Sequence, residues 1–179
     1  MRRRELSGQS LVEVAISLPV ILLLALGVTD LGRAFYYREA VTNSTRQALR
    51  VAVSPAQQTT ADAVCAGTGG ATAVTVTSSI PAGSASIATI TNNAALESSN
   101  NGAAAGSVIS GATVRVTFHC LAGVAVTNAT SNGAGPLNAG SDSVTVSITY
   151  NLSVITPLLW PVTGASFPIT VSSYQRSEY

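Results

Sequence analysis

The chain has 179 residues, of which only 9% are charged. A chain of this length has room for one membrane-spanning segment and one domain of ordinary size. All nine basic residues are arginines, and seven of them precede residue 51, so the rest of the chain lacks the basic patch that nucleic-acid binding requires. Composition therefore excludes nucleic acid as a partner.

The first predicted element is a membrane-spanning helix at Leu11–Val28. This apolar stretch of 18 residues is interrupted only by Glu13, Ser17 and Pro19. At a rise of 1.5 Å per residue it reaches about 27 Å, which is enough to cross the hydrocarbon core of a bilayer. A removable secretory signal is the alternative, because three arginines precede the run, but no small-x-small cleavage site follows it.

Glu13 is the residue of this segment that most requires an explanation. A charge in a membrane-spanning helix costs about 2.5–3.5 kcal/mol at the helix centre and less toward the ends. Recognition of a neighbouring subunit would offset this cost. The alternative is a carboxylate that snorkels to the interface.

The helix is predicted to run from about residue 11 to 53, beyond the membrane. Ser54-Pro55 is the expected stop, because the residue before a proline avoids helical geometry. Polar residues fill the opposite face of an amphipathic helix that packs on its own domain, on other helices, or on both. The predicted packing stripe consists of Leu31, Ala34 or Phe35, Arg38, Val41, Thr45, Leu49 and Ala52.

The charge distribution predicts a single-pass topology with a cytoplasmic N-terminus. Arg2, Arg3 and Arg4 favour this orientation, although four further arginines between residues 33 and 50 weaken the positive-inside argument. The polar, cysteine-bearing C-terminal part favours export. Residues 9–53 are thus expected to form a transmembrane and amphipathic helix, and residues 54–179 an exported domain.

The exported domain is predicted to be rich in β-strands. Apolar and polar residues alternate over 71–80, 112–120 and 142–154, and Phe167 to Val171 reads as a final strand. Alternation with period two is typical of half-buried antiparallel strands. The stretches 81–111 and 127–141, which are dominated by small and polar residues, are predicted as long flexible loops. The expected fold class is α+β, with a long helix followed by a small antiparallel sheet.

Cys65 and Cys120 are predicted to form a disulfide in an oxidising compartment, closing a loop of about 55 residues. The alternative is two unrelated buried thiols. His119 precedes Cys120 on a predicted strand, where neighbours point to opposite faces, so the two do not form a catalytic pair. Because no paired carboxylates, metal-ligand spacing or phosphate loop occurs, we expect no catalytic residue, metal or cofactor.

A set of spaced motifs marks both ends of the chain. The N-terminal set is Gly8-Gln9-Ser10-Leu11-Val12-Glu13-Val14-Ala15, Leu18-Pro19, Gly27, Asp30-Leu31-Gly32-Arg33 and Arg46-Gln47-Ala48-Leu49-Arg50. The C-terminal set is Val144-Thr145-Val146, Tyr150, Pro157-Leu158-Leu159, Ser172-Ser173 and Glu178. Together they closely resemble the TadE-like family, pseudopilin-like minor components of the tight-adherence (Tad) branch of type IV pilus systems. The resemblance covers residues 7–50, extends to 142–179 and is absent between.

This resemblance implies a prepilin peptidase site between Gly8 and Gln9, with residues 1–8 as a leader peptide. Glu13 would then be the fifth residue of the mature chain and would dock in the membrane onto the freed α-amine of an adjacent subunit. Pro19 removes one helical hydrogen bond, so it would kink the helix and allow local unwinding when the subunit leaves the bilayer. The alternative for Pro19 is a passive kink.

The resemblance also implies partners and a location. The partners would be other pilins or pseudopilins, the Tad assembly platform, the prepilin peptidase and the lipid bilayer. The location would be the bacterial inner (cytoplasmic) membrane and, after incorporation, an extracellular pilus. We expect a non-enzymatic minor pilin or pseudopilin that supports pilus assembly, adhesion or surface attachment. The alternative is a permanently anchored surface-binding module that is neither processed nor incorporated into a filament.

Overall fold

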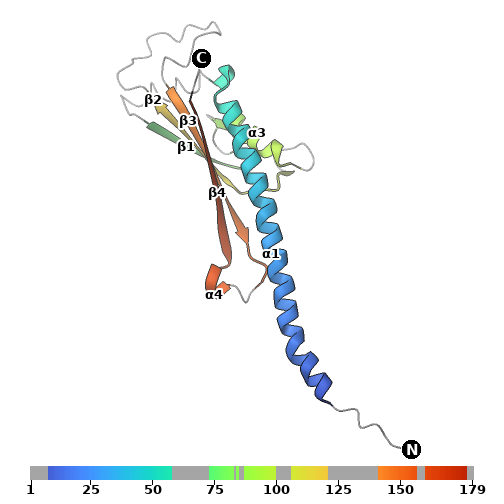
Figure 1. The fold of residues 1–179 in the computed structure, drawn as a ribbon. Coiled ribbons are helices and arrows are strands. Elements are labelled where there is room, and N and C mark those ends of the chain that lie inside the picture. The colour runs from blue at the N-terminus through green and yellow to red at the C-terminus, as the bar shows by residue number, and fades with distance from the viewer. Residues whose placement is uncertain are drawn as a thin grey trace, which may run out of the picture. The chain divides into compact units, whose positions relative to one another are not determined.

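The computed structural model describes residues 8–57, 73–82, 84, 87–99, 106–120, 141–156 and 160–176. It confirms the α+β class, with a long apolar N-terminal helix followed by a four-stranded antiparallel sheet. In chain order the elements in Figure 1 are α1 (Gln9–Ala52), a 3-10 turn (Pro55–Gln57), β1 (Ala73–Ser79), α3 (Ala88–Glu97), β2 (Thr113–Cys120), β3 (Ser141–Ser153), α4 (Trp160–Thr163) and β4 (Ser166–Arg176).

The chain divides into two compact units, and α1 contributes to both. The first unit combines Met1–Tyr36 with Ser153–Phe167, and the second combines Tyr37–Leu152 with Pro168–Tyr179. The first unit holds the apolar half of α1 and the connection between β3 and β4. The second unit holds most of the sheet, α3 and the last turns of α1.

Helix α1 is continuous over 44 residues and ends close to the predicted stop. Its last residue is Ala52, one before the predicted boundary, and the chain then turns through Ser54 into the 3-10 turn. The hydroxyl of Ser54 donates to the carbonyl of Val51 at 2.6 Å, which satisfies one of the acceptors that a helix end leaves unpaired. The N-terminal boundary is Gln9, directly after Gly8.

The sheet of the second unit has the order β1-β2-β3-β4, and its inner face is apolar. Antiparallel register pairs the buried side chains of β2 with those of β3: Val114 with Ile148, Val116 with Val146 and Phe118 with Val144. The other face is polar, and hydroxyl pairs join neighbouring strands across it. These pairs are Thr75 with Thr117, Thr149 with Thr170 and Ser147 with Ser172.

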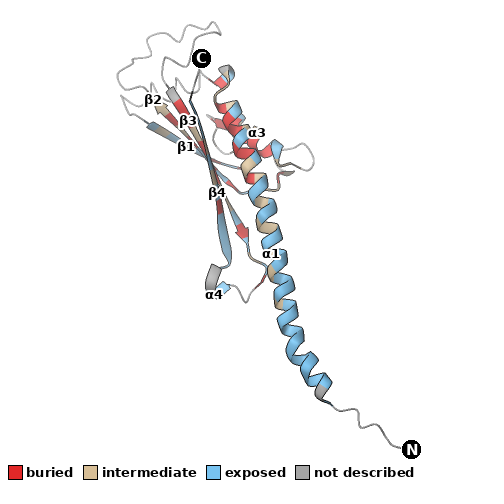
Figure 2. Cartoon of the chain, viewed as in Figure 1, coloured by how far each residue is buried: buried red, intermediate tan, exposed pale blue. Residues whose placement is uncertain are grey.

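Two helices supply much of the rest of the core in this second unit, as the buried segments in Figure 2 show, and Ile80, Ile109 and Ala112 outside the helices and strands are buried as well. Small side chains on both helices permit close packing. The last turns of α1 bury Val41, Ser44, Thr45, Ala48, Leu49 and Ala52, and α3 buries Ile90, Thr91, Ala94 and Ala95.

Two expectations from the sequence are wrong in part. The stretch 81–111, which we expected to be a loop, contains the helix α3, because Ile87, Ile90 and Ala94 recur at helical spacing and are fully buried. In the predicted stripe of α1, Leu31, Phe35 and Arg38 are exposed, whereas the stripe from Val41 onward is buried as expected. Of the second predicted loop, residues 127–140 lie outside the described residues, and Ser141 already belongs to β3.

Candidate functional site

The apolar half of α1 exposes its side chains along its whole length. Of the described residues, α1 provides the one helix that is long and apolar enough to cross a membrane. Every described side chain from Ser10 to Leu22 is exposed. The large apolar side chains that are exposed on this half are Leu11, Val12, Val14, Ile16, Leu18, Val20, Ile21, Leu22, Leu24, Leu26, Val28, Leu31, Phe35 and Tyr36. An apolar surface of this size requires a bilayer or protein partners.

The hydroxyls of Ser17 and Thr29 are satisfied within the helix, whereas the Glu13 carboxylate is not. Ser17 donates its hydroxyl to the carbonyl of Glu13 at 2.6 Å, and Thr29 donates to the carbonyl of Ala25 at 2.9 Å. Such bonds to the preceding turn remove the need for water. The Glu13 carboxylate is exposed, and no ion pair joins it to another described residue.

The structure places the expected peptidase site at the start of the helix. Gly8 is exposed and precedes the first helical residue, Gln9, while its carbonyl accepts the N–H of Val12 at 3.2 Å. Pro19 lies inside the continuous helix, where the ring leaves the carbonyl of Ala15 without its usual helical donor. Whether the chain is cut after Gly8 stays a prediction, as does the docking role of Glu13.

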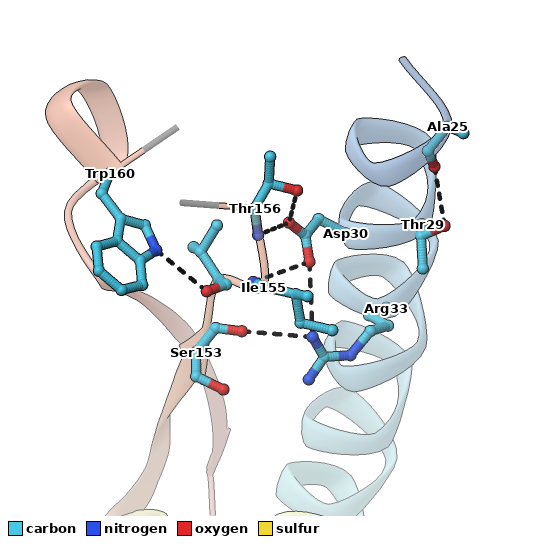
Figure 3. A network of polar contacts seen from close by, with 9 residues as sticks. Ala25, Thr29, Asp30, Arg33, Ser153, Ile155, Thr156 and Trp160 are labelled. Carbon is cyan, nitrogen blue, oxygen red and sulfur yellow. Dashed lines mark hydrogen bonds and ion pairs between the residues drawn. The ribbon is translucent and has the colours of Figure 1, made fainter. Parts of the chain in front are cut away.

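Asp30 fastens the segment after β3 to α1, an arrangement that sequence reasoning missed. One carboxylate oxygen, Oδ1, accepts the N–H of Ile155 at 3.2 Å. The other, Oδ2, accepts the N–H of Thr156 at 3.0 Å and its hydroxyl at 2.7 Å, as Figure 3 shows. All three residues joined by these bonds lie in the first unit, and Thr156 is buried. Three donors therefore converge on a single carboxylate.

Arg33 completes this contact one turn further along the helix. Its Nη1 lies 3.6 Å from Oδ1 of Asp30 and donates to the carbonyl of Ser153 at 3.4 Å. The pKa of Asp30 is held below its ordinary value, chiefly by the hydrogen bond from the Thr156 hydroxyl. The two backbone N–H groups and the Arg33 guanidinium lower this pKa less, and desolvation acts to raise it. Asp30 lies two residues beyond the apolar stretch that ends at Val28. Asp30 and Arg33 of the Asp30-Leu31-Gly32-Arg33 motif thus both bind the backbone segment that follows β3.

The connection between β3 and β4 is closed by its own hydrogen bonds. The N–H of Val154 donates to the carbonyl of Ala165 at 3.1 Å, and the indole Nε1 of Trp160 donates to the carbonyl of Val154 at 3.2 Å. Gly164 follows α4 with φ of +75°, a conformation that favours glycine at the end of a helix. These bonds hold Trp160 close to the segment that Asp30 fastens.

The remaining motif residues of α1 lie in the second unit. Ala48 and Leu49 are buried, whereas Arg46 and Arg50 are exposed and line an open groove of about 470 Å³. Tyr150, from the C-terminal motif set, stacks on Tyr37 of α1 with ring centroids 4.9 Å apart. Tyr150 therefore links the sheet to α1, and Ala48 and Leu49 belong to the core of this unit.

The predicted disulfide and the excluded catalytic pair both involve the end of β2. Cys120 is partly buried there, and Cys65 lies outside the described residues, so the bridge stays a prediction. His119 Nε2 lies 3.2 Å from the hydroxyl of Thr145, and its ring meets that of Tyr174 edge-on. Within the part of the chain that the structure describes, no group of three or more His, Cys, Asp or Glu side chains could hold a metal ion.

Comparison with known proteins agrees with the motifs at the N-terminus. The family model described as TadE-like protein matches residues 8–50. The matched range contains the Gly8–Gln9 junction, Glu13, Pro19 and the Asp30–Arg33 pair. No curated protein and no solved structure matches the chain. Residues 8–50 are therefore similar to the TadE-like family, over the same stretch as the N-terminal motifs.

Proposed function

We propose that this protein is a membrane-anchored minor pilin or pseudopilin of a Tad-type pilus or a related secretion apparatus. The match of residues 8–50 to the TadE-like family supports association with Tad pilus components. In this proposal α1 anchors the chain in the bacterial inner membrane with its N-terminus in the cytoplasm and the β-rich domain exported. Its partners are other pilins and the assembly platform, and its role is assembly, adhesion or surface attachment without catalysis.

The observation that carries the proposal is the unsatisfied carboxylate of Glu13 on an exposed apolar helix. Ser17 and Thr29 bond within the helix, but Glu13 has no described partner. A buried carboxylate becomes tolerable when a cation is brought next to it. Cleavage after Gly8 by a prepilin peptidase would create an α-amine at Gln9, and the α-amine of a neighbouring subunit would provide this cation. Assembly would then offset the free-energy cost of placing the Glu13 carboxylate in the membrane.

N-terminal sequencing and intact mass of the membrane-extracted protein test the processing step. We expect a chain that starts at Gln9 in cells that contain the prepilin peptidase, and an uncut chain in cells that lack it. An uncut chain in both strains would contradict the proposal.

Substitution of Glu13 tests the docking step separately. Glu13→Gln keeps the size of the side chain and removes its charge, so membrane insertion should be retained while incorporation into sheared filaments is lost. Val14→Ala, at the exposed neighbouring position, is the matched control and should assemble normally. Normal assembly of Glu13→Gln would rule out the docking role.

A permanently anchored surface-binding module is the second candidate. The polar outer face of the sheet favours it, because strands in the second unit present Thr, Ser and His side chains on that face. This candidate predicts an uncut N-terminus and absence from sheared filaments, together with loss of surface attachment when the gene is deleted.

A further inference from the structure

The connection between β3 and β4 is unusually apolar for an exposed segment. Residues 153–167 read SVITPLLWPVTGASF and contain no Asp, Glu, Lys, Arg or His. Among its described side chains, Ile155 is 52% exposed, Trp160 47% and Phe167 49%. Isolated apolar residues on a surface are ordinary, but a charge-free run that exposes several of them indicates a partner.

The hydrogen bonds of the first unit fix the direction in which this segment runs along α1. Ser153 bonds to Arg33, and the next residues, Ile155 and Thr156, bond to Asp30. The chain therefore advances toward the N-terminal, apolar half of the helix as it leaves β3. In Figure 3, α4 lies level with the turn of α1 that contains Ala25.

The distance from this segment to the predicted membrane is short. Asp30 is two residues beyond Val28, the last residue of the apolar stretch. At a rise of 1.5 Å per residue this separation is about 3 Å along the helix axis. A membrane that takes up Leu11–Val28 thus has its boundary at the level of Asp30 and the segment bound to it.

The side chains of the segment suit this boundary. Tryptophan is enriched at membrane–water interfaces, because its ring is apolar while its N–H requires a hydrogen-bond partner. Here the Nε1 of Trp160 is already bonded to the carbonyl of Val154, so the ring can leave water without an unpaired donor. The absence of charge removes the electrostatic penalty that charged side chains would incur on the hydrocarbon side of this interface.

We propose that the described residues of the β3–β4 connection, which expose Ile155 and Trp160, rest in the interface of the bilayer that α1 crosses. This contact with lipid is a second one that does not span the membrane, and Asp30 holds the segment at the level of the membrane boundary. The inference rests on the membrane insertion of α1, which belongs to the proposed function, but it does not depend on processing or on pilus assembly.

Trp160 is the one tryptophan of the chain, so its fluorescence reports on this segment without any substitution. The full-length protein is reconstituted in vesicles of phosphatidylcholine and phosphatidylglycerol. Three quenchers are compared: phosphatidylcholine brominated near the headgroup, phosphatidylcholine brominated near the chain end, and acrylamide in water. The depth reference is Trp160→Phe/Leu22→Trp, which places the tryptophan at an exposed position within the spanning stretch.

We expect blue-shifted emission from Trp160, with a larger loss of intensity from the shallow bromines than from the deep bromines or acrylamide. The reference variant should show the opposite order of depths. If acrylamide alone quenches Trp160 while the brominated lipids quench the reference variant, the inference is overturned. Insertion of α1 would then still stand. Protection from all three quenchers, with emission that changes on protein dilution, would assign the surface to a protein partner and also overturn it. A reference that lipid does not quench would refute insertion of α1 itself.

Discussion

Truncation of Ile90 tests the packing of α3, the element that the sequence did not predict. Ile90 is fully buried in the core of the second unit. Removing its outer side-chain atoms forfeits about 0.8 kcal/mol per methylene-sized group, and the cavity that remains adds to this loss. Alanine recovers a few tenths of a kcal/mol through its higher helix propensity. We therefore expect Ile90→Ala to lower the free energy of unfolding by about 3 kcal/mol.

Urea unfolding of the full-length protein in detergent micelles, followed by far-UV circular dichroism, measures this loss. The helix half embedded in detergent contributes a constant signal, so the transition reports on the second unit. With a slope of about 2 kcal/mol per M, the midpoint should fall by about 1.5 M. Ile90→Val should lose about 1 kcal/mol, and Asn92→Ala, at an exposed position of the same helix, should stay within about 0.5 kcal/mol. An Ile90→Ala midpoint equal to that of Asn92→Ala would refute the packing of α3 in the core.

Two further predictions concern Asp30 and the cysteines. Because the folded-state pKa of Asp30 is lowered, its contribution to stability is present above the pKa of an unfolded aspartate and is lost as the pH falls through the lowered value. In hydrogen exchange, the amides of Ile155 and Thr156 should therefore stay protected at neutral pH and lose protection only in acid. In Asp30→Ala the same two amides should be unprotected at every pH. Equal protection in this variant and in the original protein would refute the contact. The Cys65–Cys120 bridge should change electrophoretic mobility on reduction and contribute about 4 kcal/mol in the chain-entropy model. Unchanged mobility, with both thiols open to alkylation, would exclude the bridge.

Helix α3 was not predicted from the sequence, because it packs largely through small side chains. Its buried side chains include two alanines and a threonine, which carry little hydrophobic signal within a stretch rich in Asn, Ser and Gly. The strands were easier to predict, because the alternation of Val114, Val116 and Phe118 with polar residues is strong over a short distance. Periodicity identifies an element when its apolar positions are large, and it fails when the element packs through small side chains.

The sequence by itself determined the apolar segment long enough to cross a membrane, the extent of α1 to within two residues and the period-two strands, since each of these depends on neighbouring residues. Only the tertiary structure decided the partner of Asp30, because Thr156 lies 126 residues away and a single carboxylate does not specify which backbone it will bind. It also decided which part of the predicted stripe is buried. Leu31 and Phe35 follow the helical period as well as Val41 does, but they are exposed, whereas Val41 belongs to the core of the second unit. Local pattern sets the faces of a helix, and burial depends on what the rest of the chain brings against them.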